Sequence, residues 1–142
     1  MNKIKIAIKG IIIYQSKFLI VKDTSLDKTG KKYEWWGIPG GKPEKGENPK
    51  ETLLREIKEE TNLDVQIVKI LDCYSGFGKI DQQYFITVYL CKTKNNAIDL
   101  NKNPAKDEEL LEFKWVTKEE FLTGAYFVKT QALKNIVRDL EF

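Results

Sequence analysis

The feature that most constrains the fold is one helix whose two ends are both marked, at residues 48–62. Asn48 is a preferred N-cap residue, Pro49 suits the first helical position, and Glu51 completes a capping box with Asn48. Asn62 tolerates the left-handed conformation in which many helices end. The helix is therefore predicted to begin and end sharply, directly after a glycine-rich segment.

Strand patterns lie on both sides of this helix. Isoleucines alternate with lysines near the N-terminus, as in a half-buried strand. Further apolar or β-branched runs predict a hairpin turning at Gln15-Ser16-Lys17 and several more strands, at residues 11–14, 18–21, 65–74, 84–91 and 111–116. Two more helices are expected, one opened by a capping box of Thr117 and Glu120 and one from about Gln131. This order predicts a single mixed α/β domain over residues 1–142.

Two long polar stretches, residues 22–47 and 92–108, are predicted to be loops. Loops of this length in compact domains are usually functional or disordered. The first contains Tyr33, Trp35 and Trp36, and these aromatic side chains indicate that it is ordered.

Composition excludes several classes of function. The 142 residues are 42% hydrophobic and 32% charged, as in an ordinary soluble domain, and the net charge of +3 is not concentrated in a basic run that would bind a nucleic acid polymer. No apolar run is long enough to span a membrane, and the alternating N-terminal pattern does not fit a signal peptide, so a cytoplasmic location is expected. The sequence has no histidine, which removes imidazole from any mechanism.

The two cysteines do not predict a metal site. Cys73 and Cys91 lie in separate strand-like runs and form no CxxC pair, so zinc is not supported. Buried free thiols are the expectation for a reducing compartment, and a single disulfide between the two stays open.

Three glutamates of the central helix lie at the edge of its apolar face. With Glu56 at zero on a helical wheel, Glu59 falls near about −60° and Glu60 near about +40°. The predicted buried face follows between about 60° and 160° and is formed by Leu53, Ile57, Thr61 and Leu54. Carboxylates so close together at the edge of a core repel one another strongly.

Two interpretations of the three glutamates are open. Either raised pKa values of the carboxyl groups or bound cations would offset the repulsion, and ligands that are all oxygens suit hard ions such as Mg²⁺ or Mn²⁺. Alternatively, the glutamates are exposed and pair with Lys58 and Arg55, as in many surface helices. The wheel alone does not separate these alternatives.

The stretch from Gly41 to Leu63 resembles the Nudix box, the signature of the Nudix hydrolase family. That box has the spacing Gly, five residues, Glu, seven residues, Arg-Glu, apolar, any, Glu-Glu, any, Gly, apolar, and this chain supplies Gly41, Glu47, Arg55, Glu56, Ile57, Glu59, Glu60 and Leu63 at those positions. Its single departure is Asn62 in place of the family glycine, and asparagine can adopt the same left-handed cap. The preceding "WWGIPGG", and downstream Glu109, the Trp115-Val116 pair and "TKEEF", also resemble the family.

The resemblance implies a fold and a set of roles. The fold is an α/β/α sandwich around a mixed central sheet. Glu56, Glu59 and Glu60 would hold Mg²⁺, for which Mn²⁺ can substitute, with the Gly41 carbonyl as a further ligand. Arg55 and Glu47 would form an ion pair that fixes the loop onto the helix. The general base that accepts a proton from water would be Glu56, Glu59 or Glu109, and members of the family differ on this point.

The substrate is less constrained than the reaction. The resemblance implies hydrolysis of a pyrophosphate bond in a nucleoside diphosphate derivative. The chain lacks the downstream proline of ADP-ribose hydrolases and an arginine-rich coenzyme A marker, so nucleoside or deoxynucleoside triphosphates, including oxidised or non-standard ones, are expected. The aromatic residues that are candidates to stack on a base, unless they belong to the core, are Tyr33, Trp35, Trp36, Tyr74 and Phe77.

Rival functions remain open alongside this one. ADP-ribose or another nucleotide sugar is the alternative substrate, and a non-catalytic nucleotide-sensing module on the same fold is the alternative of another class. An isomerase branch of the superfamily uses histidine ligands, which this chain lacks. The partners expected are a small nucleotide and, at most, a second copy of the chain, so the protein is predicted to be a monomer or a homodimer.

Overall fold

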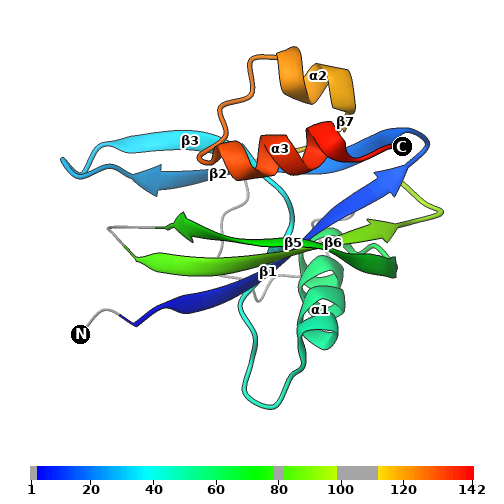
Figure 1. Ribbon diagram of the computed structural model, residues 1–142, viewed down its shortest axis with the longest axis horizontal. Coiled ribbons are helices and arrows are strands. Elements are labelled where there is room, and N and C mark those ends of the chain that lie inside the picture. The colour runs from blue at the N-terminus through cyan, green and yellow to red at the C-terminus, as the bar shows by residue number, and fades with distance from the viewer. Residues whose placement is uncertain (1–2, 79–81, 99–111) are drawn as a thin grey trace.

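The computed structural model describes residues 3–78, 82–98 and 112–142 and combines strands with three helices in these residues (Figure 1). The strands are β1 (Lys5–Tyr14), β2 (Lys17–Leu26), β3 (Lys32–Gly37), β4 (Gly40–Gly41), β5 (Gln66–Phe77), β6 (Gln83–Lys92) and β7 (Glu112–Thr117). The helices are α1 (Pro49–Thr61), α2 (Lys118–Thr123) and α3 (Gln131–Asp139).

The strands form one mixed sheet in the order β3-β2-β1-β6-β5, with β4 paired to β1 and β7 paired to β2. β1 and β6 run parallel, and the other pairs are antiparallel. β1 and β2 are joined by a two-residue turn in which Gln15 and Ser16 have φ of 47° and 62°. The predicted hairpin is therefore confirmed, although Lys17 already belongs to the second strand.

Helices cover both faces of the sheet, so the predicted α/β/α arrangement is confirmed. In Figure 1, α1 lies below the central strands, and α2 and α3 lie together above them. Each face has its own apolar core. The core beside α2 and α3 consists of Ile11, Phe18, Ile20, Ile38, Val88, Val116, Phe121, Leu133, Val137 and Leu140. The core beside α1 consists of Ile8, Ile12, Leu19, Leu53, Ile57, Leu63, Tyr89 and Cys91.

The α1 helix begins and ends where the sequence predicts. Asn48 accepts a hydrogen bond from the Glu51 backbone, and the reciprocal contact from the Glu51 side chain completes the capping box. Asn62 caps the other end with φ of 63°, in the left-handed region. Leu53 and Ile57 face β1 at Gly10, where an added Cβ would lie 3.4 Å from a methyl carbon of each. This close approach fixes the helix against the sheet.

Two predictions about the elements are wrong. Residues 22–47 are not one long loop, because β2 continues to Leu26 and pairs with β3 over Val21–Leu26. The residues from Lys22 to Ser25 are all polar, and β3 includes Lys32 and Glu34, so a search for apolar runs does not find these strands. Leu54 is not part of the buried face of α1, since it is 43% exposed. It lies at the far end of the predicted arc, turned away from β1.

The exposed residues of β1 and β5 also differ from expectation. Ile8 is buried as predicted, but Ile4 and Ile6 are about half exposed because α1 packs further along β1.

Cys91 is buried and Cys73 is exposed on β5, the last strand of the sheet, and both thiols are free. The expectation of two buried thiols is therefore wrong for Cys73, and the cysteines form no disulfide. Within the described residues, no helix is long and apolar enough to cross a bilayer.

Candidate active site

The glycine-rich turn between β3 and α1 is held against β1. Gly40 and Gly41 form the short strand β4, which pairs with Ile8 and Lys9 of β1, and Gly10 donates a hydrogen bond of 2.9 Å to the Pro39 carbonyl. Gly40 has φ of +143°, and a Cβ there would overlap the backbone carbonyl of Ile8. Only glycine therefore fits this position.

The carboxylates of α1 lie directly beneath this turn. A Cβ added to Gly41 would overlap the carboxylate of Glu56, so the bare backbone allows that side chain to approach. Glu60 accepts a hydrogen bond of 3.4 Å from the Gly40 backbone. Glu56 is 7% exposed and Glu60 is 5% exposed, which confirms the predicted position of both at the edge of the core. Two buried carboxylates at such an edge need compensating charge.

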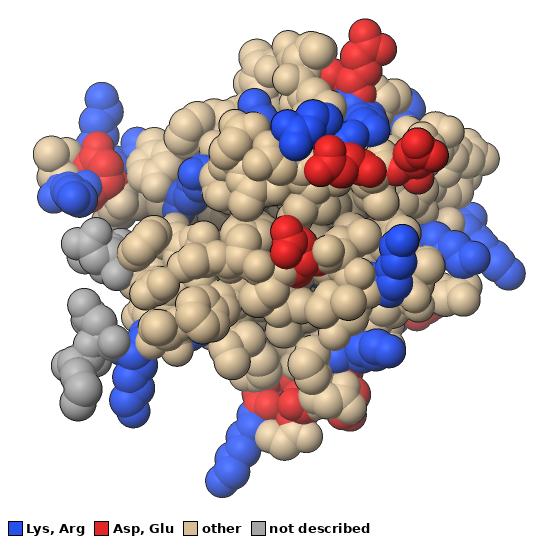
Figure 2. Space-filling model, viewed as in Figure 1, with Lys and Arg blue, Asp and Glu red and all other residues tan. Residues whose placement is uncertain are grey.

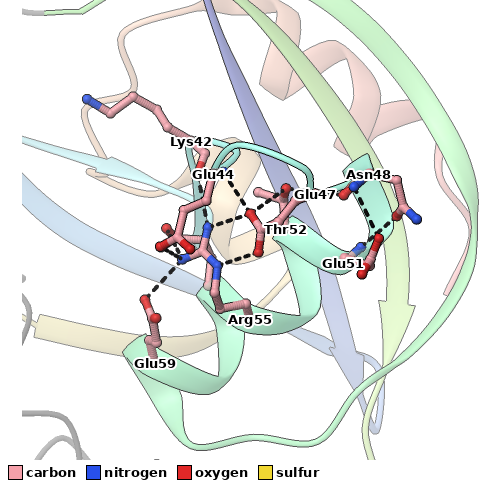
Figure 3. A network of polar contacts seen from close by, with 9 residues as sticks. Lys42, Glu44, Glu47, Asn48, Glu51, Thr52, Arg55 and Glu59 are labelled. Carbon is pink, nitrogen blue, oxygen red and sulfur yellow. Dashed lines mark hydrogen bonds and ion pairs between the residues drawn. The ribbon is translucent and has the colours of Figure 1, made fainter.

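Arg55 supplies that charge to Glu56. Its Nε donates to Glu47 at 2.6 Å and its Nη2 donates to the other oxygen of Glu47 at 2.9 Å, a two-pronged contact. Its Nη1 donates to Glu56 at 2.9 Å and to Glu59 at 3.3 Å. Figure 3 shows the guanidinium at the centre of this network, with its Nη2 also donating to the Lys42 carbonyl at 3.1 Å. One cation thus joins the loop before α1 to carboxylates on the helix.

The ion pair between Arg55 and Glu47 that the resemblance implies is therefore present. The Arg55 hydrogen bond lowers the pKa of Glu47 from its usual 4.5 to about 2. The same contact raises the pKa of Arg55 above its already high value. Glu47 also accepts hydrogen bonds from the Glu44 backbone at 2.8 Å and from the Thr52 hydroxyl at 3.1 Å. Glu47 is thus fixed from the loop and from the helix.

The residues of this site suit a divalent cation. Glu56, Glu59 and Glu60 offer only oxygen atoms, and the bare Gly41 backbone leaves room that a side chain would fill. In residues 3–78, 82–98 and 112–142, no group of three acidic, cysteine or histidine side chains is already arranged to hold an ion. Arg55 lies between Glu56 and Glu59 instead. Glu59 is the most exposed of the three, with 32% of its side chain accessible, so it has the most freedom to turn towards an ion.

The aromatic candidates for substrate binding divide into two groups. Trp36 and Tyr74 pack against the core beside α2 and α3, and burial raises the pKa of Tyr74 to about 12. Phe77 is 63% exposed at the end of β5. Tyr33 and Trp35 lie together on β3, where the ammonium of Lys129 covers both rings at 5.5 Å and 4.5 Å from their centroids. The core interpretation therefore fits Trp36 and Tyr74, whereas Tyr33 and Trp35 are partly buried but belong to neither core.

Three further residues complete the comparison between the predicted site and the structure. Glu109, a predicted alternative base, lies outside the described residues. Thr52 and Lys129 were not predicted. The Thr52 contact with Glu47 spans five positions at the start of a helix, and a search for side-chain contacts around the N-cap could have found it. Nothing in the sequence links Lys129 to Ser25, 104 positions away.

Comparison with known proteins adds to the evidence from the motif. The chain belongs to the NUDIX domain family, whose model matches residues 5–140. The solved structure of a NUDIX hydrolase from Nitrosomonas europaea superposes with a TM-score of 0.74 at 16% identity, covering 96% of this chain and 88% of that one. At this identity the likeness shows the fold.

Three curated relatives cover different shares of the chain. Nudix hydrolase 6 of Arabidopsis thaliana is 28% identical over 70% of this chain and 34% of its own length. An ADP-ribose pyrophosphatase of Methanocaldococcus jannaschii is 32% identical over 58% of this chain and 47% of its own length. An RNA pyrophosphohydrolase of a Nitratiruptor species is 32% identical over 72% of this chain and 71% of its own length. The chain thus spans only about a third to a half of the length of the first two.

Proposed function

We propose that this chain hydrolyses a pyrophosphate bond in a nucleoside diphosphate derivative with the help of Mg²⁺ or Mn²⁺. The substrate class proposed is a nucleoside or deoxynucleoside triphosphate, cleaved to the monophosphate and pyrophosphate. Oxidised or non-standard bases fall within this class. The proposal follows the family to which the chain belongs, and the relatives named as pyrophosphatases and pyrophosphohydrolases support it.

The observation that carries the proposal is the arrangement around Gly40 and Gly41. Two buried carboxylates, Glu56 and Glu60, lie against a backbone turn from which side chains are excluded. A helix that needed only solubility would not bury two acids beside its apolar face. The arrangement is what a site for a cation and a phosphate chain requires, because both must come close to the backbone.

The residues of the chain have distinct roles in this proposal. Glu56, Glu59 and Glu60, with the Gly41 carbonyl, would hold the cation, and when bound it would neutralise phosphate charge and acidify water. Arg55 orients Glu56 and Glu59 through its Nη1 and fixes the loop through Glu47. One of Glu56, Glu59 or Glu109 accepts the proton from the attacking water. Arg55 is a positioning residue in this scheme, because its contacts are to the other side chains.

A panel of nucleotides with and without Mg²⁺ tests the proposal. Triphosphates, ADP-ribose and a dinucleoside polyphosphate would be incubated with the protein in water labelled with ¹⁸O, and the products identified. Release of monophosphate and pyrophosphate, only when Mg²⁺ is present, is the expected result. Metal-independent release, or no release from any nucleotide, would contradict it.

Two alternatives stay open, and a relative supports the first of them. ADP-ribose hydrolysis is favoured by the relative from Methanocaldococcus jannaschii, and rapid turnover of ADP-ribose beside inert triphosphates would establish it. A non-catalytic nucleotide sensor would bind nucleotides without turning them over. We place the protein in the cytoplasm as a monomer or homodimer, which fractionation and sedimentation would test.

A further inference from the structure

A second polar cluster lies away from the carboxylates. We call it the Lys129 cluster, and it consists of Ser25, Tyr33, Trp35, Phe127 and Lys129. The ammonium of Lys129 donates to the Ser25 hydroxyl at 2.9 Å and lies over the rings of Trp35 and Tyr33. The Phe127 ring meets Tyr33 edge to face, with centroids 6.2 Å apart. Phe127 and Lys129 come from the connection between α2 and α3, which is bonded to β3 through Trp36 and the Phe127 carbonyl.

The Lys129 cluster lies on the same face of the sheet as α1. Leu19 of β2 belongs to the core that includes Leu53 and Ile57 of α1. β2 pairs without a bulge with β7 and then with β3, so its side chains alternate regularly from Leu19 to Ser25. Ser25 therefore shares the face of Leu19. Trp35 lies there too, because its indole N–H donates to the Ser25 hydroxyl at 2.9 Å.

The cluster is also close to the glycine-rich turn. The Trp35 ring lies over Gly37, where an added Cβ would be 2.7 Å from a ring carbon. Gly37 and Gly41 are four residues apart, so their Cα atoms are separated by at most roughly 14 Å. A nucleotide whose phosphates lie at Gly41 would thus place its base within reach of the Lys129 cluster.

Lys129 can offer a ligand only hydrogen-bond donors, and the Ser25 hydroxyl holds it in place. Ser25 is 5% exposed and accepts hydrogen bonds from both Trp35 and Lys129. An ammonium group has three N–H donors and no acceptor, and the bond to Ser25 uses one of them. Phe127 is 57% exposed, and its ring meets Tyr33, the ring that Lys129 also covers. The space-filling view in Figure 2 shows lysine and arginine side chains scattered over the visible face. The cluster thus combines a flat apolar surface with an obligate donor.

We propose that Phe127 and Lys129 form the subsite for the nucleobase, with Phe127 stacking on the base and Lys129 donating to a carbonyl oxygen at its edge. The inference rests on the proposed nucleotide hydrolysis. Guanine, hypoxanthine, uracil and thymine present such a carbonyl, whereas adenine and cytosine present an amino donor at the same position. The site therefore favours the carbonyl bases. Trp35 and Tyr33, whose rings face Lys129, position it.

Two pairs of substrates isolate this contact. Deoxyinosine and deoxyadenosine triphosphates exchange a carbonyl for an amino group, as do deoxyuridine and deoxycytidine triphosphates. We expect kcat/KM to be on the order of tenfold higher for the carbonyl member of each pair. Lys129→Met keeps the aliphatic stem and should bring the ratio to about one, because the donor is lost. Lys129→Arg, which still donates only, should preserve the preference.

Lys114→Met is the matched control. Lys114 also lies over an aromatic ring, at 5.5 Å from the centroid of Tyr126, but it does not belong to the Lys129 cluster. This variant should keep the wild-type ratio. A merely structural role of Lys129 would lower kcat/KM for every base alike and leave the ratio unchanged. An unchanged ratio in Lys129→Met, or no preference in the wild type, would overturn the inference.

A binding measurement separates this inference from the proposed function. Inosine and adenosine monophosphates would be titrated into the protein without metal, with tryptophan fluorescence as the readout. If no triphosphate is hydrolysed, the proposed function fails, but tighter binding of inosine monophosphate that is lost in Lys129→Met still supports the subsite. Equal affinity for the two, or binding of neither, overturns it.

Discussion

The carboxylate site and the Lys129 cluster differ in the separation of their residues along the chain. Arg55 and Glu47 are eight positions apart, and the Glu56 and Glu59 partners of Arg55 are one and four positions away. Lys129 and Ser25 are 104 positions apart. The first site forms from one loop and one helix, so its geometry is set by local rules. The second exists only once the sheet has formed and the connection between α2 and α3 has reached β3.

The largest effect should come from the local site. Glu60→Gln keeps the shape of the side chain and removes its charge, so the fold should persist while activity falls by more than about 100-fold, the scale of a lost charge-stabilising group. Thermal stability without metal should rise, because repulsion among the carboxylates is relieved, and stabilisation by Mn²⁺ should weaken. Nucleotide turnover and thermal unfolding with and without Mn²⁺ measure these effects. Wild-type turnover in Glu60→Gln would show that Glu60 is not a ligand.

The local site also depends on a long-range contact, the pairing of Gly40 with β1. Gly40→Ala should lower the free energy of unfolding by more than about 3 kcal/mol, because the new Cβ would overlap the Ile8 carbonyl and φ is +143°. Gly46→Ala is the matched control. Gly46 also has a positive φ, of +89°, but no atom lies within 4 Å of its added Cβ. Gly46→Ala should lower the free energy of unfolding by about 1 kcal/mol, from backbone strain alone. Equal losses by urea unfolding would show that the contact with β1 is unimportant.

The sequence predicted the local site in detail for a physical reason. Capping and helix periodicity act within a few residues, and Asn48 and Asn62 lie where these rules put them. The Arg55–Glu47 pair, which the resemblance to the Nudix box implies, is also present. The central position of Arg55 among three carboxylates was not evident, because a helical wheel does not show a loop folding back over the helix.

The parts that the sequence did not predict depend on pairing between distant segments. β3 lies in a segment that reads as a polar loop, and it is a strand because β2 pairs with it and the 124–130 connection is bonded to its other edge. Leu54 and Ile6 are exposed because α1 crosses β1 at Gly10, which no local pattern specifies. The Lys129 cluster likewise forms only through contacts between distant segments.

Ser25→Ala probes the long-range cluster. The hydroxyl accepts hydrogen bonds from Trp35 and Lys129, and its removal leaves the indole N–H without that partner. We expect a loss of about 1–3 kcal/mol in the free energy of unfolding. The Arg55 network should be unaffected, so turnover per folded molecule should keep its dependence on Mg²⁺. A stability within about 0.5 kcal/mol of wild type would show that the cluster is not a fixed unit.

The Arg55–Glu47 pair should appear in the pH dependence of stability. Because the folded pKa of Glu47 is lowered, to about 2 from its usual 4.5, the pair stabilises the fold above pH 4.5 and this contribution is lost as the pH falls towards about 2. The free energy of unfolding of the wild type should therefore fall more steeply across that interval than that of Glu47→Gln, which has no carboxyl group to titrate. Urea unfolding at several pH values measures both slopes. Equal slopes would contradict the pairing.

The smallest effect concerns the end of α1, the one position of the box where this chain departs from the family. Asn62 has φ of 63° and ψ of 12°, and its backbone N–H donates to the Lys58 carbonyl. Glycine adopts this left-handed conformation without the strain of a side chain, so Asn62→Gly should raise the free energy of unfolding by up to about 1 kcal/mol and leave activity within a few-fold. Asn62→Ala is the control, because alanine has the side-chain strain without the tolerance of asparagine for this region, and it should destabilise. Urea unfolding of the three proteins gives the order expected for a purely conformational effect: glycine, asparagine, alanine. A large loss on Asn62→Gly would instead show that the asparagine side chain stabilises the helix end, and the departure from the family glycine would then be a contact of this chain's own.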